Sequence, residues 1–310
     1  MELNPALLPT LVDWPRDEAA HEGVPWEIWW ITTILTSGER RLAAHLTLQH
    51  LESGEVIVVA TIADLDEETG NSLRVTAARG ESTLTTDHLE TTTKAGRFSG
   101  SFSTGYEVHA ELDDGNSFDL VLNPTRPVLF NAGAGQYKLG AHVTTQYSIA
   151  GLEATGTIRL GGQAMSVTGH GWYDRQWMHS GTVADIPTFS WFGICLEGGE
   201  TISLFDTSMN ADGGHTWATI MQSDGTHVLA AVEPVAKWAS GTFGTPQGRT
   251  VPREWRLVIP ERRAELTVVQ RMVEDTPGFF FYSGALEVTG SYDGADVAGY
   301  GFCDLVGWPS

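Results

Sequence analysis

The sequence has few cysteines and few basic residues, and each shortage excludes a class of protein. Cys195 and Cys303 lie inside apolar strand-like runs and form no CxxC pair, so we expect buried free thiols rather than a disulfide framework. Only 18 lysines and arginines accompany 39 aspartates and glutamates, which leaves a formal charge of −21. This charge repels nucleic acid and anionic membrane surfaces, so we expect no nucleic-acid partner.

Long apolar runs and familiar catalytic motifs are missing too. No run approaches the roughly 18 apolar residues of a membrane span, and the first twenty residues lack the basic and apolar regions of a secretory signal. We therefore expect a cytoplasmic protein without stable membrane insertion. The chain has no GxSxG, GxxxxGK or HExxH motif and no paired-cysteine spacing, so the sequence predicts neither a metal nor an organic cofactor.

Helical periodicity is nearly absent, whereas short β-strand patterns fill the chain. These segments alternate apolar and polar residues or carry β-branched runs, and they cover 40–65, 82–94, 96–124, 151–172 and most of 189–308. Glycine accepts the positive φ of tight hairpins, and glycine-containing turns occur at 53–55, 113–115, 212–214, 223–225 and 292–294. The sequence predicts an all-β protein made of antiparallel barrels or sandwiches.

The length and one proline- and glycine-rich segment indicate two domains. A chain of 310 residues exceeds the usual size of one domain. Residues 122–143 carry prolines and glycines that suit a crossover between domains. We place a boundary near residue 155, which gives β-domains over 1–155 and 156–310. The chain contains no repeat of identical sequence.

The stretch GHGWYDRQWMHS, residues 169–180, concentrates aromatic and titratable side chains between glycines. In an extended strand, alternate residues share a face, which groups His170, Trp172, Asp174 and Gln176 against Tyr173, Arg175 and Trp177. The first face suits an aromatic pocket wall with an acid or hydrogen-bond donor. For Asp174 a structural ion pair is an equal alternative. Arginine's bidentate geometry favours a bracing role for Arg175.

The segment WEIWW raises the same choice between packing and function. Trp26, Ile28 and Trp30 share one strand face, and Glu27 and Trp29 share the other. At least one tryptophan is expected to face a cavity or a domain interface. Burial would raise the pKa of Glu27 and make it a neutral donor, although a solvent-facing or salt-bridged glutamate is the favoured alternative.

Further pocket candidates come from strand positions that alternation could turn inward. Lone histidines in strands are more often structural than catalytic, and none of these residues stands out alone. The additional substrate-contact candidates are His142, Tyr147, Trp191, Asp206 and Tyr282.

Three segments together resemble a known family. PWEIWWITTILTSG (25–38), VTGHGWYDRQW (167–177) and YSGALEVTGSYDGADVAGYGFCDLVGW (282–308) are similar, in order, to the lipocalin-like carotenoid 1,2-hydratases (hydroxyneurosporene synthases). That family includes AttH-type proteins and natural-product Diels–Alderases. Compared with the family's G-x-A-W-x-D-R-E-W motif, Gly171 replaces alanine and Gln176 replaces glutamate. Near the end, Asp304 stands where relatives often carry glutamate, and Trp308 replaces tyrosine.

The resemblance implies two calycin-like β-domains around an apolar pocket, without a metal or organic cofactor. Three functions follow as alternatives. The first is a cyclase that folds a polyene, polyketide-type intermediate for a [4+2] cycloaddition, which needs a shaped wall and a hydrogen-bond donor. The second is alkene hydration, with Asp174 as the acid and aromatic faces stabilising a cation. The third is a noncatalytic carrier of an apolar small molecule.

Overall fold

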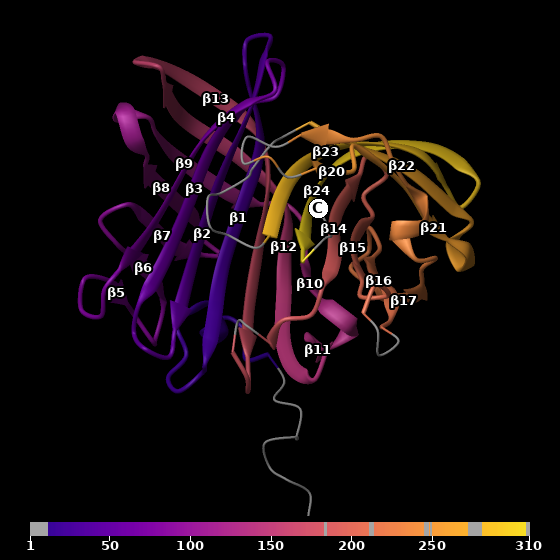
Figure 1. Ribbon diagram of the computed structural model, residues 1–310, viewed down its shortest axis with the longest axis horizontal. Coiled ribbons are helices and arrows are strands. Elements are labelled where there is room, and N and C mark those ends of the chain that lie inside the picture. Colours follow the sequence, from indigo (N-terminus) through magenta and orange to yellow (C-terminus); the bar gives the residue numbers. More distant parts are fainter. Residues whose placement is uncertain are drawn as a thin grey trace, which may run out of the picture.

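Two curled antiparallel sheets lie side by side and account for most of the molecule (Figure 1). This computed structural model describes residues 12–182, 185–210, 214–244, 248, 250–271 and 281–307. The helical segments among these residues are short 3-10 turns: η2 (Arg16–Glu18), η3 (Asp113–Gly115), η4 (Asn131–Gly133), η6 (Val235–Trp238) and η7 (Pro260–Arg262). The prediction of an all-β protein is confirmed. None of the helices in these ranges is long and apolar enough to cross a membrane.

The first sheet follows the order β4-β3-β2-β1-β13-β12-β9-β8-β7-β6-β5, and β10 and β11 also pair with β12. Its strands are β1 (Trp26–Ser37), β2 (Arg40–Leu51), β3 (Val56–Asp64), β4 (Thr69–Ala77), β5 (Thr83–Leu84), β6 (Leu89–Thr92), β7 (Gly96–Ser101), β8 (Gly105–Glu111), β9 (Ser117–Pro124), β10 (Val128–Phe130), β11 (Gln136–Leu139), β12 (His142–Leu160) and β13 (Gln163–Met178). The sheet curls into a half-barrel, called here the first half-barrel.

The second sheet follows the order β17-β16-β15-β14-β24-β23-β22-β21-β18 and forms the second half-barrel. Its strands are β14 (Phe189–Leu196), β15 (Thr201–Asp206), β16 (Thr216–Met221), β17 (His227–Ala231), β18 (Ala239–Ser240), β21 (Glu254–Ile259), β22 (Ala264–Gln270), β23 (Phe281–Tyr292) and β24 (Ala295–Val306). A separate ribbon joins β19 (Phe243–Gly244) to β20 (Thr250–Val251).

The chain passes from the first sheet to the second between β13 and β14. Residue 155, where the sequence places its domain boundary, lies inside β12, which is paired with β13 along almost its whole length. The proline-rich segment before it does not separate the sheets, because β10 and β11 within that segment hydrogen-bond to β12. Tight turns occur as expected at 53–55, 113–115, 223–225 and 292–294, whereas residues 211–213 of the remaining turn lie outside the described residues.

Burial along the strands shows which part of each sheet is covered on both sides. In β9 the apolar Phe118, Leu120 and Leu122 are buried and the residues between them are mostly exposed, as in a strand with one solvated face. In contrast, β1 is buried at eight successive positions from Trp26, and β14 and β15 are buried almost throughout. These central strands are covered by a half-barrel core on one face and by the other sheet on the opposite face.

The two half-barrels have the same strand order around their centres. The series β2-β1-β13-β12-β9 in the first sheet corresponds to β15-β14-β24-β23-β22 in the second. The equivalent strands carry a degenerate repeat that identity alone does not detect: YSIAGLEATG (147–156) matches YSGALEVTG (282–290), and GHGWYD (169–174) matches GYGFCD (299–304). The molecule is therefore a pseudo-duplicate whose two halves meet through equivalent strands.

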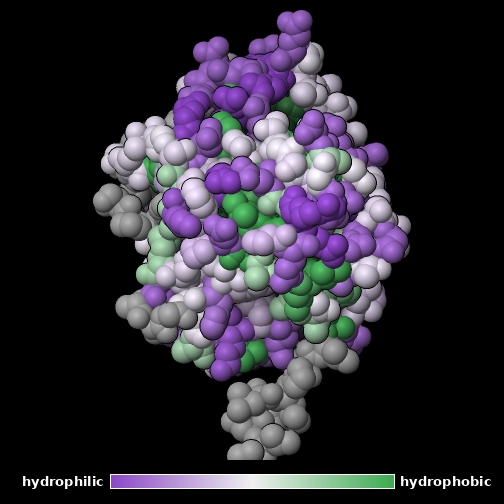
Figure 2. Space-filling view, turned by 90° about the vertical axis from the view of Figure 1, so that its right-hand side faces the viewer, coloured by the Kyte–Doolittle hydropathy of each residue, from purple (hydrophilic) through white to green (hydrophobic). Residues whose placement is uncertain are grey.

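The outer surface of the second half-barrel is largely hydrophilic, with small separated apolar patches (Figure 2). Leu229 on β17 and Val121 on β9 are the large apolar side chains most exposed among the described residues. Cys195 and Cys303 are buried free thiols, as the sequence predicted. The apolar side chains thus gather inside each half-barrel and between the two sheets.

Candidate active site

Aromatic side chains fill the middle of the interface between the sheets. Trp30 of β1 contacts Trp191 of β14 edge to face, with ring centroids 5.3 Å apart. Trp172 of β13 contacts the same Trp191 at 5.6 Å, and Phe302 of β24 lies 6.3 Å from Trp30. Such edge-to-face pairs add about 0.5–1.5 kcal/mol each beyond the area that they bury. This aromatic block holds the two half-barrels in a defined relation.

Asp174 lies on the interface face of β13, beside this aromatic block. Its Oδ1 accepts hydrogen bonds from the Ser148 hydroxyl at 2.5 Å and from Trp172 Nε1 at 2.8 Å. Burial raises the pKa of Asp174 to about 7, although the bonds from Ser148, Trp172 and Gln146 act in the opposite direction. A large fraction of the Asp174 carboxyl is therefore protonated at neutral pH.

A second carboxyl, which is half-buried, occupies the equivalent place in the other sheet. Asp304 of β24 pairs laterally with Trp191 and Ser283, just as Asp174 pairs with Trp30 and Ser148. The Ser283 hydroxyl donates to Asp304 Oδ1. Burial raises the pKa of Asp304 to about 7, and the nearby charge of Asp174 raises it further. The charge of an ionised Asp174 thus disfavours ionisation of Asp304.

Asp304 also lines a mainly apolar cavity at one end of the interface. The cavity has a volume of about 50 Å³, enough for one or two water molecules. Residues from both sheets and from the segment before β14 form its wall: Trp26, Ile28, Gln49, Leu139, Gln176, Met178, Ile186, Phe189, Asp304 and Val306. No lysine, arginine or histidine is among these lining residues. The wall therefore suits an uncharged ligand with a few hydrogen-bonding groups.

A polar network supports the cavity side of β12 and β13. Gln176 Nε2 donates to Thr144 Oγ1 at 3.0 Å and to the hydroxyl of Tyr137 at 3.4 Å. Tyr137 in turn donates to Gln146 Oε1, and the Gln146 side chain hydrogen-bonds to the Asp174 carboxyl. Burial and the charge of Asp174 keep the pKa of Tyr137 well above its usual value. These neutral groups can orient a bound hydroxyl or carbonyl without changing the charge of the site.

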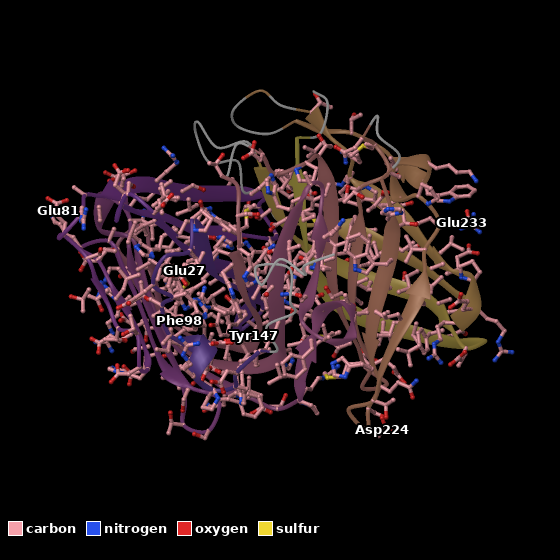
Figure 3. All side chains as sticks on the ribbon, turned by 90° about the horizontal axis from the view of Figure 1, so that it is seen from below. Glu27, Glu81, Phe98, Tyr147, Asp224 and Glu233 are labelled. Carbon is pink, nitrogen blue, oxygen red and sulfur yellow. The ribbon has the colours of Figure 1, made fainter. Side chains whose placement is uncertain are left out.

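Glu27, a candidate acid in the sequence, lies inside the first half-barrel on the opposite face of β1 (Figure 3). It forms an ion pair with Arg175 and accepts from His50 Nδ1 at 2.9 Å and from the ring of His21 at 3.0 Å. Burial alone would raise the pKa of Glu27, but the charge of Arg175 and these hydrogen bonds lower it overall. Glu27 is thus held ionised and is not a neutral donor.

Arg175 braces the N-terminal segment against the first half-barrel. Its guanidinium donates to the carbonyl oxygens of Ala19 at 2.7 Å and Asp17 at 3.2 Å, and it stacks over the Trp29 ring at 4.0 Å. It also forms the ion pair with Glu27 and donates to the Ile28 carbonyl oxygen at 3.3 Å. The expectation that Arg175 pairs with another strand is confirmed.

The remaining sequence candidates fall into separate places. Trp26 and Gln176 line the cavity, and Trp30, Trp172, Asp174 and Trp191 form the interface beside it. The aromatic residues Trp29, Tyr147, Tyr173 and Trp177 pack in the first half-barrel and Tyr282 in the second.

The remaining polar candidates lie apart from the cavity. Asp206 is buried and accepts from the backbone N–H of Val235 at 2.6 Å. His142 lies half-buried near Asp185, and His170 stacks on Tyr300 at the far end of the interface.

The alternation argument placed faces correctly, but it missed partners contributed by distant strands. Asp304, Gln49 and Tyr137 were not predicted as site residues. A signal for Asp304 was present, because GYGFCD repeats the spacing of GHGWYD and so aligns Asp304 with Asp174. Gln49 and Tyr137 had no such signal. In the described part of the chain, no three His, Cys, Asp or Glu side chains are grouped as metal ligands.

Comparisons with known proteins extend this picture. A family model described as AttH-like matches residues 5–308. The dehydratase asqC of Emericella nidulans is 22% identical over 205 residues, which cover 61% of this chain and 58% of that protein. Kievitone hydratase of Fusarium solani subsp. phaseoli is 24% identical over 205 residues, covering 63% and 58%. The chain thus spans less than two thirds of the length of these curated relatives.

Solved structures share the fold over nearly the full length. A crystal structure from Nitrosomonas europaea, assigned to AttH, superposes with a TM-score of 0.85 at 20% identity, covering 99% of this chain and 100% of that one. Kievitone hydratase from Nectria haematococca superposes with a TM-score of 0.79 at 18% identity, covering 96% and 93%. The lipocalin-like fold expected from the sequence is confirmed. Because the family model matches nearly every residue, the chain belongs to the AttH-like family.

Proposed function

We propose that this protein is a hydro-lyase that adds water to, or removes water from, an uncharged and largely apolar small molecule. The observation that carries this proposal is the pair of carboxyls at the interface, the buried Asp174 and the half-buried Asp304, one from each sheet and each with a raised pKa. Both have pKa values near 7, so one can be protonated while the other is ionised at neutral pH. An acid and a base are what a hydration or dehydration requires.

In the dehydration direction, the protonated carboxyl gives its proton to the leaving hydroxyl as the C–O bond breaks and water departs. The ionised carboxyl removes a proton from the adjacent carbon, and that electron pair forms the C=C bond. Hydration runs through the same steps in reverse. Of the two carboxyls, we assign contact with the substrate in the cavity to Asp304, because it lines the wall. Asp174 is the second carboxyl of the pair, and its charge acts on Asp304.

The cavity wall supports the substrate class. Apolar side chains predominate, and the indole N–H of Trp26 is buried with no hydrogen-bond partner among the described residues. That N–H and the amides of Gln49 and Gln176 are suited to polar groups of a neutral ligand. A ligand of ordinary size needs roughly 300–1,000 Å³. Binding of a ligand of that size therefore requires the cavity wall to move outward.

The names of two relatives support the same reaction class, since one is a dehydratase and the other a hydratase. The cycloaddition that ranks first on sequence grounds stays a second candidate. A protonated Asp304 in an apolar wall also provides a neutral donor that could polarise a dienophile carbonyl. That reaction needs only one donor and leaves the second acid without a role.

The test compares Asp174→Asn and Asp304→Asn with Glu18→Gln in the full chain, using kievitone and a linear polyene as substrate probes. Glu18 is a matched control: it is buried and its pKa is also raised to about 7, but it lies in the first half-barrel beside Tyr106. We expect each aspartate variant to lose about 100-fold or more in turnover and Glu18→Gln to retain it. In deuterated water, hydration should place a solvent-derived deuterium on carbon of the product. Dehydration should release a carbon-bound hydrogen to the solvent.

Cycloaddition gives a different pattern in the same experiment. Asparagine retains a hydrogen-bond donor, so Asp304→Asn would keep much of the rate, and the product would carry no solvent-derived deuterium on carbon. Trp26→Ala would then lower rate and selectivity by opening the wall. Such a pattern would reject the hydro-lyase proposal. Trp172 is a poorer test of the wall, because it is fully buried and is not a lining residue.

A further inference from the structure

A chain of hydrogen bonds connects Asp174 to the second half-barrel. Trp191 Nε1 donates to Ser203 Oγ at 3.0 Å, and the Ser203 hydroxyl donates to Asn131 Oδ1 at 2.6 Å. Asn131 Nδ2 donates to Ser148 Oγ at 3.2 Å, and the Ser148 hydroxyl donates to Asp174 Oδ1 at 2.5 Å. All five side chains are buried, and Asn131, Ser148 and Ser203 are fully so. The chain crosses from β14 and β15 to β12 and β13.

The direction of each hydrogen bond in the chain follows from its first donor, the indole N–H of Trp191. The Trp191 indole is a donor only, so Ser203 accepts from it and uses its single proton toward Asn131. The Asn131 amide then presents its carbonyl to Ser203 and its NH₂ to Ser148. Because Ser148 accepts from Asn131, its hydroxyl donates to Asp174 Oδ1. Because Trp172 Nε1 donates to the same oxygen, Oδ1 accepts two hydrogen bonds.

The turn that carries Asn131 is itself docked on the second sheet. Two backbone N–H groups contact the second sheet. Ala132 N in η4 donates to Thr219 Oγ1 at 2.8 Å, and Phe130 N, just before η4, donates to His227 Nε2 at 3.0 Å. The amide of Asn131 is therefore positioned by contacts with β16 and β17 as well as by the pairing of β10 with β12. Its position depends on the docking of the two half-barrels.

We propose that Asn131 and Ser203 are positioning residues, which orient Ser148 so that Oδ1 of Asp174 is an acceptor and its acidic proton is confined to Oδ2. The use of that proton in catalysis rests on the proposed hydro-lyase function, whereas its location does not. The second half-barrel thus contributes to the acid in two ways, through Asp304 and through this chain. Neither Asn131 nor Ser203 needs to touch the substrate.

The other titratable groups around Asp174 are distinct from the chain. Asp304 approaches from β24 and Tyr137 from β11, and Tyr173 is its neighbour along β13. Substituting Asn131 or Ser203 leaves these groups in place. A change in the titration of Asp174 therefore reports the loss of donated hydrogen bonds, which stabilise the ionised carboxylate.

The experiment is an infrared pH titration of the protonated carboxyl band in the full chain, with Asp174→Asn used to identify the Asp174 band. In Asn131→Ala and Ser203→Ala, Ser148 loses its polarising donor or its orientation. We expect the pH midpoint of the Asp174 band to rise by about half a pH unit, roughly a threefold change in ionisation, and its carbonyl frequency to rise as Oδ1 loses hydrogen bonding.

Thr61→Val is the matched control, because it removes a fully buried hydroxyl that hydrogen-bonds to Ser72 and belongs neither to the chain nor to the turn that carries Asn131. Near-ultraviolet circular dichroism checks the fold, and Ser203→Ala tests the proposal by itself where Asn131→Ala fails to fold. An unchanged midpoint in both alanine variants would overturn the proposal, as would an equal shift in Thr61→Val. The titration needs no substrate, so a shift in a protein without hydro-lyase activity separates the two proposals.

Discussion

At the scale of single residues, the environment of a carboxyl decides its charge. Glu27 and Asp174 are buried and Asp304 is half-buried. Glu27 faces a guanidinium, whereas the two aspartates face neutral hydrogen-bond donors. An adjacent fixed charge outweighs desolvation, whereas neutral hydrogen bonds do not. One acid therefore holds the structure together, and the other two are suited to exchange protons.

Glu27→Gln should destabilise the protein by about 3–5 kcal/mol, because it leaves Arg175 buried without its partner charge. Chemical denaturation at pH 7 measures this loss. The exposed Glu22→Gln is the control and should change stability by less than about 0.5 kcal/mol. The folded-state pKa of Glu27 is lowered, so its contribution is present at neutral pH and is lost as the pH falls below its unfolded value. Equal stability of the two variants would contradict this role.

At the scale of strands, glycines explain why the repeated motif has its spacing. A Cβ at Gly169 would lie 2.1 Å from the Ile34 carbonyl oxygen, and a Cβ at the equivalent Gly299 would lie 2.3 Å from that of Cys195. Equivalent crowding occurs at Gly156 and Gly290, which would meet carbonyl oxygens at 2.0 and 2.1 Å. In both sheets, glycine lets neighbouring strands approach closely at equivalent positions.

Gly169→Ala should therefore cost at least about 1–3 kcal/mol, because the neighbouring backbone must shift to admit the methyl group. Gly299→Ala should have a similar effect through the second sheet. Gly244→Ala is the control, since nothing lies within 4 Å of its Cβ position. Thermal unfolding of the three variants measures the difference. A Gly169→Ala protein as stable as Gly244→Ala would show that the close approach is not needed.

At the scale of the whole molecule, docking of the half-barrels shields two carboxyls from water and raises the pKa of each. For each aspartate, the folded pKa near 7 lies above the unfolded value near 3.9. The folded state therefore binds more protons between these pH values, and stability falls as the pH rises from about 4 to about 7. The rise in pKa from 3.8 to about 7 corresponds to a change of ~4 kcal/mol in the free energy of unfolding for one such carboxyl.

The double variant Asp174→Asn/Asp304→Asn should lose this dependence. It should gain stability relative to the natural chain at pH 8 and lose that gain toward pH 4, by several kcal/mol in total. Denaturant unfolding across this range measures the difference between the proteins, and contributions from other groups such as Glu18 cancel. Parallel curves for the two proteins would show that the aspartates are not protonated in the folded state.

Much of this protein was predictable from local pattern. Strand alternation and glycine turns establish an all-β chain. Alternation separates Trp26 and Trp30 from Glu27 within WEIWW, and Trp172 and Asp174 from Arg175 within GHGWYDRQW. These features depend on residues two apart along an extended strand. Such neighbours share a face in any sheet that the strand joins.

What only the tertiary structure decided is which distant strands cover each face. Asp304 lies 130 positions beyond Asp174, and Asn131 reaches Ser203 through a turn that is docked on the other sheet. The crossing from one sheet to the other occurs after β13 rather than near residue 155, because hydrogen-bonded pairing, not local composition, joins β12 to β13. The charge states of Glu27, Asp174 and Asp304 depend on burial and on partners far away in sequence, since electrostatic energies are set by distance in space and by the exclusion of water.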